Sequence, residues 1–341
     1  MTGMFPLTPD EDRQRLPVAI LSGFLGSGKT TLLNRLLHDP RMADTAVAIN
    51  EFGEIPLDQH LIDHGDDKTV VMANGCLCCN LAGDMEDAVM RIFSRRESGA
   101  IPHFARLIVE PSGLADPAPI AQAILRQPTL ARVMRLESII TVVDAVFGVR
   151  QLVEHPEARQ QAALADTLVV TKADLADPGP AIAALREHNQ AAPIHQALHG
   201  AIDPAALFPA SFLDPAAPLS PIATWIEHHP PHTHSAATSI SLIADSPLLW
   251  PAFDRWLRQV RTGHADALLR VKGLLAIAGR SRPVVIQGIH HVLHPPAELP
   301  DWPSADRRSR LVLILRDANL AADLRASWDR ALPTLTDRVP A

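Results

Sequence analysis

The stretch that decides the fold is Pro17-Val-Ala-Ile-Leu-Ser-Gly-Phe-Leu-Gly-Ser-Gly-Lys-Thr-Thr-Leu-Leu-Asn-Arg-Leu-Leu37. Its segment from Gly23 to Thr30 matches G-x-x-x-x-G-K-[ST], in which glycines let successive backbone N–H groups curl around a phosphate. An apolar strand precedes this segment and a helix follows it, so that the positive end of the helix adds to the site. This order of strand, loop and helix predicts a P-loop that binds a nucleotide.

The residue types in the loop indicate what each would do. Lys29 would reach the β- and γ-phosphates, and the Thr30 hydroxyl would ligate Mg²⁺. The nucleotide contacts expected in this region are Gly23, Gly26, Ser27, Gly28, Lys29, Thr30 and Thr31.

Short apolar runs alternate with helical patterns over about the first 200 residues. The expected strands are 18–22, 46–50, 69–73, 107–110, 139–144, 167–171 and 193–195, and the expected helices are 29–38, 84–95, 117–126, 145–153 and 180–188. Such alternation, with strands that are almost continuously apolar, is typical of a parallel sheet covered on both faces. We therefore expect an α/β fold, a P-loop NTPase with a mostly parallel doubly wound sheet.

The length of 341 residues suggests two domains. We expect a P-loop domain over residues 1–202, a linker rich in proline and histidine over 203–234, and a smaller α+β domain over 235–341. In the last region the expected order is strand 239–243, helix 248–261, strands 267–276, 284–290 and 310–315, and helix 318–331. Adjacent strands in that order predict a mainly antiparallel sheet.

The composition restricts the expected cellular location and the expected binding partners. The net charge of −7 argues against nucleic acid or an anionic membrane as the main partner. No run reaches the roughly 20 apolar residues of a membrane span, and the acidic N-terminus is unlike a secretory signal. Three cysteines do not form a disulfide framework, so we expect a cytoplasmic protein.

Two later strands end in residues suited to a guanine nucleotide and its hydrolysis. Thr171-Lys-Ala-Asp174 is similar to the guanine-reading N-K-x-D pattern, with Thr171 in place of asparagine. The Asp174 carboxylate would accept hydrogen bonds from guanine, and Lys172 would lay its stem along the base. Glu110 and Gly113 stand where an acid that binds Mg²⁺ through water or orients the attacking water, and a glycine that senses the γ-phosphate, are expected.

All three cysteines fall within four residues, at Cys76, Cys78 and Cys79. Three ionised thiolates repel one another unless a soft cation lies between them, and Zn²⁺ would need one further N or O ligand. The alternatives are cysteines that only pack in the interior and a single catalytic thiolate.

With these motifs in place, the chain resembles the CobW-like P-loop GTPases, a family of metal chaperones. The matching segments are the P-loop, Asn50–Glu54 with Asp58, Gly75–Cys79, Glu110–Pro117, Val143–Ala145, Thr171–Asp174, Leu269–Gly273 and Val285–Gly288. The resemblance implies a first switch over 50–58 and a second over 110–116, with the cysteine loop between them, and it makes Glu51 a further metal ligand. The sequence departs from the family at Pro111-Ser112, which bears on the hydrolysis rate, and at Thr171, which bears on guanine selection.

The sequence therefore predicts a GTPase with slow intrinsic turnover, whose nucleotide state controls the binding and delivery of Zn²⁺, or of Co²⁺ or Fe²⁺, to a client protein. We expect the client to meet the C-terminal domain, and a homodimer is a further expectation. The open alternatives are a P-loop kinase of a small metabolite with a structural zinc site, and a metal sensor that binds nucleotide without turnover.

Two histidine clusters and one pair of basic residues remain outside these motifs. The linker histidines His228, His229, His232 and His234 either load metal or are solvated. His290, His291 and His294 are expected at the surface or in packing. Arg270 and Lys272 share one face of a strand, which we expect to be exposed, the alternative being a contact with the nucleotide or the client.

Overall fold

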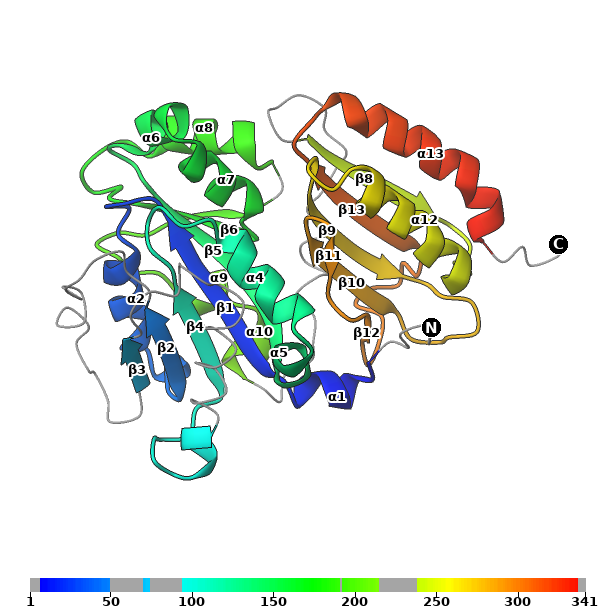
Figure 1. Cartoon of the computed structure of the whole chain (residues 1–341). Helices are drawn as coiled ribbons and strands as arrows, with labels where there is room; N and C mark the ends of the chain where they lie inside the picture. Colours follow the sequence, from blue (N-terminus) through cyan, green and yellow to red (C-terminus); the bar gives the residue numbers. More distant parts are fainter. Residues whose placement is uncertain (1–6, 50–69, 74–93, 191, 215–237, 337–341) are drawn as a thin grey trace. The chain divides into compact units, whose positions relative to one another are not determined.

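The computed structural model of the chain describes residues 7–49, 70–73, 94–190, 192–214 and 238–336 (Figure 1). These residues form two compact units. The P-loop unit holds residues 15–186 and 192–214, and the C-terminal unit holds residues 7–14, 187–190 and 238–336.

The P-loop unit is built on a seven-stranded sheet with the order β3-β2-β4-β1-β5-β6-β7, in which every pair of neighbours is parallel. Its strands are β1 (Leu16–Gly23), β2 (Thr45–Ile49), β3 (Val70–Ala73), β4 (Arg106–Glu110), β5 (Met134–Asp144), β6 (Thr167–Thr171) and β7 (Ile194–Gln196). The predicted strands are confirmed with small changes of boundary. Strand β1 lies at the centre and all of its residues are buried, which explains why it reads as an unbroken apolar run.

Helices cover both faces of this sheet (Figure 1). They are α2 (Lys29–Leu37), α4 (Pro117–Arg126), α5 (Pro128–Val133), α6 (Gly148–Glu154), α7 (Pro156–Leu164), α8 (Gly179–His188), α9 (Pro204–Leu207) and α10 (Ala210–Leu213), with a short 3₁₀ helix at Pro40–Met42. One apolar core contains residues of α2, α9 and α10, and another contains residues of α6, α7 and α8. The doubly wound α/β fold is therefore confirmed. The helix expected over 84–95 lies mostly outside the described residues.

The parallel order places the ends of four neighbouring strands side by side. Strands β4, β1, β5 and β6 end at Glu110, Gly23, Asp144 and Thr171. Ligands of such sheets bind beyond the carboxyl ends of the strands, so the motifs that are scattered through the sequence meet at one edge of the sheet.

The C-terminal unit is an antiparallel sheet with the order β11-β10-β9-β13-β8, and β12 also pairs with β10. Its elements are β8 (Thr238–Ala244), α12 (Trp250–Gly263), β9 (Leu268–Leu275), β10 (Val284–Ile289), β11 (Val292–Leu293), β12 (Ala297–Glu298), β13 (Ser309–Leu315) and α13 (Asn319–Leu335). Both helices pack on one face of the sheet around Phe253, Trp256 and Trp328. The predicted α+β order is confirmed, with β11 and β12 as additions.

The start of the chain belongs to the C-terminal unit, whereas the sequence placed residues 1–202 together. The backbone N–H of Leu7 donates to the oxygen of Pro296 at 2.7 Å, and the N–H of Glu298 donates to the oxygen of Leu7 at 2.8 Å. Helix α1 (Pro9–Arg13) follows, with a capping box between Thr8 and Glu11. This pairing spans almost the whole sequence, so no local pattern could predict it.

The expected linker also begins later than residue 203. Asp203 caps α9 by accepting a hydrogen bond from the backbone N–H of Ala205 at 2.9 Å. Phe208 and Phe212 stack with their ring centres 4.5 Å apart and are buried in the core beside α2. Residues 203–214 therefore belong to the P-loop unit, because their apolar side chains complete its core.

The expectation for Arg270 and Lys272 was wrong, because both residues are buried, with 2% and 4% of their surface exposed. They lie on β9, a central strand with a neighbour on each side. Among the three late histidines, His294 is buried and His291 is exposed.

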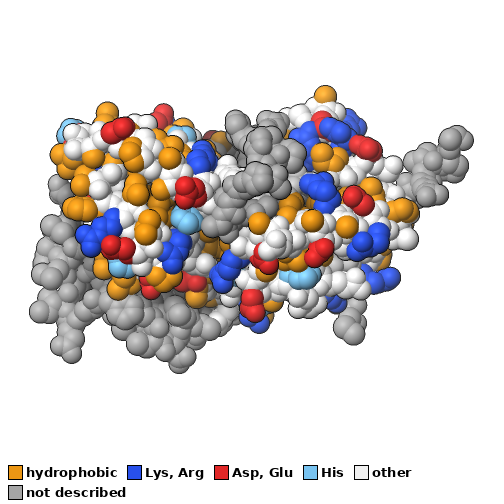
Figure 2. Space-filling model, turned by 90° about the horizontal axis from the view of Figure 1, so that it is seen from above, with side chains coloured by type: hydrophobic (Ala, Val, Ile, Leu, Met, Phe, Trp, Pro, Cys, Tyr) orange, Lys and Arg blue, Asp and Glu red, His pale blue; other side chains and the backbone are white. Residues whose placement is uncertain are grey.

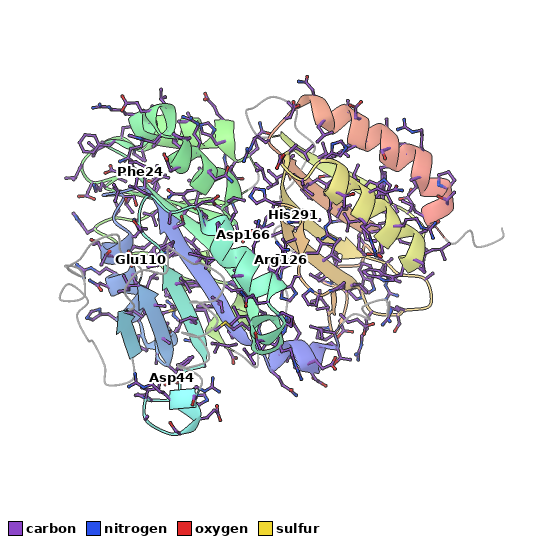
Figure 3. All side chains as sticks on the ribbon, in the orientation of Figure 1. Phe24, Asp44, Glu110, Arg126, Asp166 and His291 are labelled. Carbon is purple, nitrogen blue, oxygen red and sulfur yellow. The ribbon has the colours of Figure 1, made fainter. Side chains whose placement is uncertain are left out.

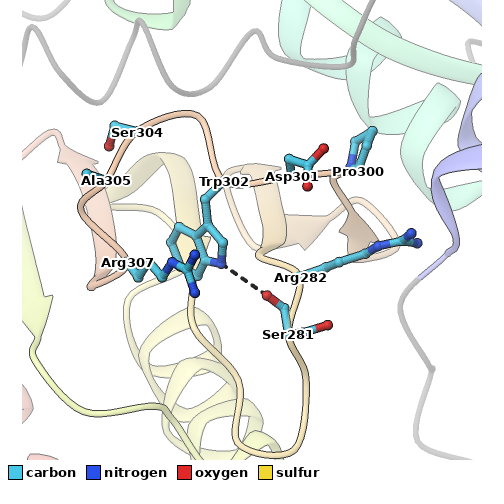
Figure 4. A pocket seen from close by; sticks show the side chains of 8 residues that line it. All are labelled: Ser281, Arg282, Pro300, Asp301, Trp302, Ser304, Ala305 and Arg307. Carbon is cyan, nitrogen blue, oxygen red and sulfur yellow. Dashed lines mark hydrogen bonds between the residues drawn. The ribbon is translucent and has the colours of Figure 1, made fainter.

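Two surface features complete the description. A polar pocket of about 530 Å³ in the C-terminal unit has Arg282, Trp302 and Arg307 in its wall, and the indole N–H of Trp302 donates to the Ser281 oxygen at 3.2 Å (Figure 4). On the face shown in Figure 2, basic and acidic side chains are interspersed with apolar ones. Among the described residues, no helix has the length and apolar character needed to cross a membrane.

Candidate functional site

The P-loop closes tightly between β1 and α2. Gly28, the residue before α2, has a φ of 93°, a left-handed conformation that glycine adopts without strain. A Cβ on Gly23 would lie 2.4 Å from the backbone oxygen of Val142, so only glycine fits there. No side chain caps α2, which leaves the N–H groups of its first turn available to a phosphate.

Lys29 lies folded over the loop from which it starts. Its Nζ donates to the backbone oxygens of Gly23 at 2.9 Å and Phe24 at 3.3 Å, and the residue is 9% exposed. These two carbonyls hold the ammonium group at the mouth of the loop, where a phosphate could replace them as its partner. Figure 3 labels Phe24 in this loop.

Thr30 and Glu110 meet across the end of the sheet. The Thr30 hydroxyl donates to Oε1 of Glu110 at 2.9 Å, and Glu110, labelled in Figure 3, is 4% exposed at the end of β4. A hydroxyl and a carboxylate are the hard oxygen donors that Mg²⁺ takes from proteins. The chemistry of this pair therefore fits the expected magnesium ion.

The segment after Glu110 packs closely on the P-loop. A Cβ on Gly113 would lie 2.7 Å from the backbone nitrogen of Leu25. From the other side, the buried Gln161 of α7 donates through Nε2 to the oxygens of Gly113 at 3.0 Å and Ala115 at 2.9 Å. Gly113 is thus held between the phosphate loop and a buried amide.

The expected guanine-reading segment is tied to the same loop. The Thr171 hydroxyl lies 2.6 Å from the backbone oxygen of Ser27, and Lys172 Nζ donates to the oxygen of Gly26 at 2.8 Å. Lys172 also forms an ion pair with Asp144. The departure at Thr171 therefore keeps a polar link to the P-loop, because the short hydroxyl reaches a backbone oxygen directly.

Asp174 lies further along the same turn. Its Oδ2 is 3.3 Å from Nδ1 of His199, which follows β7, and the Asp174 side chain is 22% exposed. The neighbouring Gly200 approaches Thr31, since a Cβ there would lie 3.2 Å from the Thr31 side chain. The structure therefore brings the loops after β1, β6 and β7 together, with Thr31 exposed in the first turn of α2.

The expected metal ligands Cys76, Cys78, Cys79 and Glu51 lie outside the described residues, as do the four linker histidines. Within the part of the chain that the structure describes, no group of three or more His, Cys, Asp or Glu side chains is arranged to hold a metal ion.

The sequence of this chain matches the descriptions of two protein domains. The CobW/HypB/UreG nucleotide-binding domain matches residues 17–198. The chain belongs to the CobW/HypB/UreG family. Residues 237–332 match the CobW C-terminal domain, so that the family covers both units in order and the expected resemblance is confirmed.

Individual proteins of known name are also similar to this chain in sequence and structure. The zinc chaperone YjiA of Escherichia coli is 32% identical over 301 residues, which are 88% of this chain and 93% of that protein. The zinc-regulated GTPase metalloprotein activator 1 of Dictyostelium discoideum is 34% identical over 40% of this chain and 32% of its own length. The crystal structure of Zn(II)-bound YjiA GTPase from E. coli superposes with a TM-score of 0.68 and 27% identity, over 93% of this chain and 99% of that one.

Three residues of the CobW site escaped individual assignment from the sequence. Gln161 lies in α7, a helix with a weak apolar pattern that was not predicted. Asp144 was part of a matching motif but received no role, and His199 stands outside every motif. The signal that could have found Asp144 and His199 is their position at the end of β5 and shortly after β7, at the edge where ligands bind.

Proposed function

We propose that the chain is a GTP-hydrolysing zinc chaperone, which binds zinc in one nucleotide state and releases it to a client protein in the other. The observation that carries this proposal is the match in order, over nearly the whole chain, to a zinc chaperone whose zinc-bound structure is that of a GTPase. The geometry of the P-loop unit supports the nucleotide half of the proposal.

Hydrolysis would be the in-line attack of water on the γ-phosphate, with catalysis by position and charge. Lys29, which lies against two loop carbonyls, would transfer its hydrogen bonds to the phosphates. The backbone N–H of Gly113 would meet the γ-phosphate, because Gly113 already lies against the P-loop. Glu110 would orient the attacking water or hold a metal-bound one.

Thr30 and Glu110 would hold the magnesium ion, which neutralises charge on the phosphates when it is bound. The protein's own part is to keep these two oxygens at the foot of the P-loop. Thr30 is fixed by α2 and Glu110 by β4, so the pair does not depend on a loop for its position.

Guanine would be selected by Asp174, whose carboxylate accepts from N–H groups that adenine lacks. Its support in the structure is the attachment of Thr171 and Lys172 to the P-loop, which sets the base-reading turn at a fixed place relative to the phosphates. A competition experiment tests this: excess ATP should leave bound GDP in place, and displacement by ATP would contradict the guanine assignment.

Zinc would be the cargo of Cys76, Cys78 and Cys79, with Glu51 as a fourth ligand. The neighbouring parallel strands β2 and β3 end at Ile49 and Ala73, shortly before Glu51 and Cys76 in the sequence. These strands end at the same edge of the sheet as Glu110. A nucleotide that orders both switches there would change the ligand geometry and so the zinc affinity.

The decisive experiment is a Zn²⁺ titration with GDP and with a non-hydrolysable GTP analogue, on the wild type and on Cys78→Ser. We expect at least tenfold tighter binding with the analogue, and we expect Cys78→Ser to abolish the difference. A matched variant that replaces His228, His229, His232 and His234 by alanine should keep it. Equal affinity in both nucleotide states would contradict the proposed coupling.

Other expectations stay predictions. They concern the client that would bind through the C-terminal unit, the homodimer, the cytoplasmic location, and Co²⁺ or Fe²⁺ as the cargo. Multiple-turnover hydrolysis of GTP would exclude the sensor that binds nucleotide without turnover.

A further inference from the structure

Asp144 is a buried carboxylate whose oxygens are all engaged by the protein. It is the last residue of β5 and is 1% exposed. Oδ1 accepts from the backbone N–H of Val146 at 2.6 Å and of Phe147 at 3.2 Å, and Oδ2 pairs with the Lys172 ammonium. These bonds form a turn before α6, which explains why that helix begins at Gly148 and not at the expected Ala145.

Lys172 is the point at which three segments meet. It follows β6, its Nζ donates to Gly26 of the P-loop at 2.8 Å, and the same Nζ contacts Asp144 at the end of β5. Its backbone has a φ of 56°, the left-handed region that non-glycine residues rarely adopt. With only 33% of its side chain exposed, the ammonium group needs a nearby countercharge.

The hydrogen bonds of Thr171 and Lys172 to the P-loop differ in whether they need a countercharge. Thr171 bonds the Ser27 oxygen through a neutral hydroxyl that needs no counterion. Lys172 donates to the Gly26 oxygen through a charged ammonium group. In the described structure this ammonium contacts the Gly26 carbonyl and the Asp144 carboxylate. Without Asp144, a charged group in this position would turn toward solvent and leave the P-loop.

We propose that Asp144 is a positioning residue for the nucleotide. It holds Lys172 so that the lysine stem lies along the purine base while the ammonium fixes the P-loop at Gly26. Asp144 thereby joins the base-reading and phosphate-binding parts of the site without contributing an oxygen to the nucleotide. This inference rests on the proposed function, in which Thr171–Asp174 read guanine.

The test measures GDP affinity by equilibrium titration with a fluorescent GDP analogue. Asp144→Asn keeps an oxygen for the Val146 and Phe147 N–H groups but removes the charge that faces Lys172. We expect the Kd for GDP to rise about tenfold, the middle of the range for coupled members of one ion-pair network. The matched control is Asp166→Asn at the opposite end of β6 (Figure 3), where the carboxylate accepts from the Ile139 N–H at 2.9 Å. This control variant should change the Kd less than twofold.

A double-mutant cycle separates positioning from a general loss of structure. In a Lys172→Met background, Asp144→Asn should raise the Kd less than twofold, because the lysine through which it acts is gone. Equal loss of affinity in both backgrounds would mean a purely structural role and would overturn the proposal. Should Asp144→Asn fail to fold, Lys172→Met alone must still raise the Kd about tenfold or more, and a smaller effect overturns it.

One further variant distinguishes a failure of this inference from a failure of the proposed function. Asp174→Asn should weaken GDP and favour xanthosine diphosphate, whose C2 carbonyl accepts from the new amide. If this preference does not change, the guanine assignment fails. If it changes while Asp144→Asn binds GDP as tightly as the wild type, the guanine assignment stands and the role of Asp144 is refuted.

Discussion

Gly113→Ala tests whether the second switch works through its contact with the P-loop. The added Cβ would lie 2.7 Å from the backbone nitrogen of Leu25 and 2.9 Å from its Cα. Because non-bonded atoms come to rest at about 3.5 Å, the two segments would have to separate by about 0.8 Å. A displacement near 1 Å at a reacting centre costs about 100-fold in rate, or about 2.7 kcal/mol of barrier.

The assay is single-turnover hydrolysis of GTP with enzyme in excess, together with GDP affinity. We expect the hydrolysis rate to fall about 100-fold and GDP affinity to change less than twofold, since GDP lacks the phosphate that Gly113 would meet. The control is Gly263→Ala at the end of α12, where a Cβ would meet nothing within 4 Å. A Gly113→Ala enzyme that hydrolyses GTP within threefold of the wild-type rate would refute the reasoning.

Three further predictions concern stability. Glu137→Gln should lower the free energy of unfolding by about 3–5 kcal/mol in urea titrations, because it leaves the buried Arg135, now 2.9 Å from Glu137, without its countercharge. Replacing both residues by methionine should restore much of that loss, and a single variant as stable as the wild type would contradict this. Trp328→Ala should cost about 3–5 kcal/mol in the C-terminal unit, since the ring is 2% exposed and packs edge-on against Trp256 at 4.9 Å; an unchanged denaturation midpoint for that unit would argue against it. Burial lowers the pKa of His195, so the unfolded chain binds the proton more readily. Stability should therefore fall as the pH drops below the ordinary histidine value of about 6.5. Thermal melts from pH 8 to 5 should show a shallower fall for His195→Gln, and an unchanged slope would exclude this source.

The sequence was sufficient for the elements that carry a local signal. The P-loop, the parallel strands of the first region and the strand and helix order of residues 238–336 were read correctly, whereas α5 and α7 were missed. Each depends on a short pattern: glycines at fixed spacing, apolar runs of strand length, or an apolar face at helical spacing such as that of α12. The contact between Thr30 and Glu110 fits the parallel order, because Thr30 lies in the first turn of α2 after β1 and Glu110 ends the neighbouring strand β4.

The sequence did not reveal which strands pair or which residues distant in the chain come into contact. The β3-β2-β4-β1-β5-β6-β7 order depends on crossovers that no single segment encodes. Arg270 and Lys272 alternate with apolar residues like an exposed face, yet both are buried on the central strand β9. Gln161 was missed because its helix has only a weak apolar pattern, and its two hydrogen bonds reach a segment nearly fifty residues earlier in the chain.

The attachment of residues 7–14 to the C-terminal unit makes the P-loop unit an insertion within it. A fragment that begins at residue 238 would lack Leu7, so the backbone oxygen of Pro296, just before β12, and the backbone N–H of Glu298, within β12, would lose their partner. Unpaired strand edges recruit other chains, so such a fragment would tend to self-associate. An independent C-terminal unit would need residues 7–14 joined to its first strand. Because residues 187–190 also belong to this unit, a cut between the two units would sever the chain in four places.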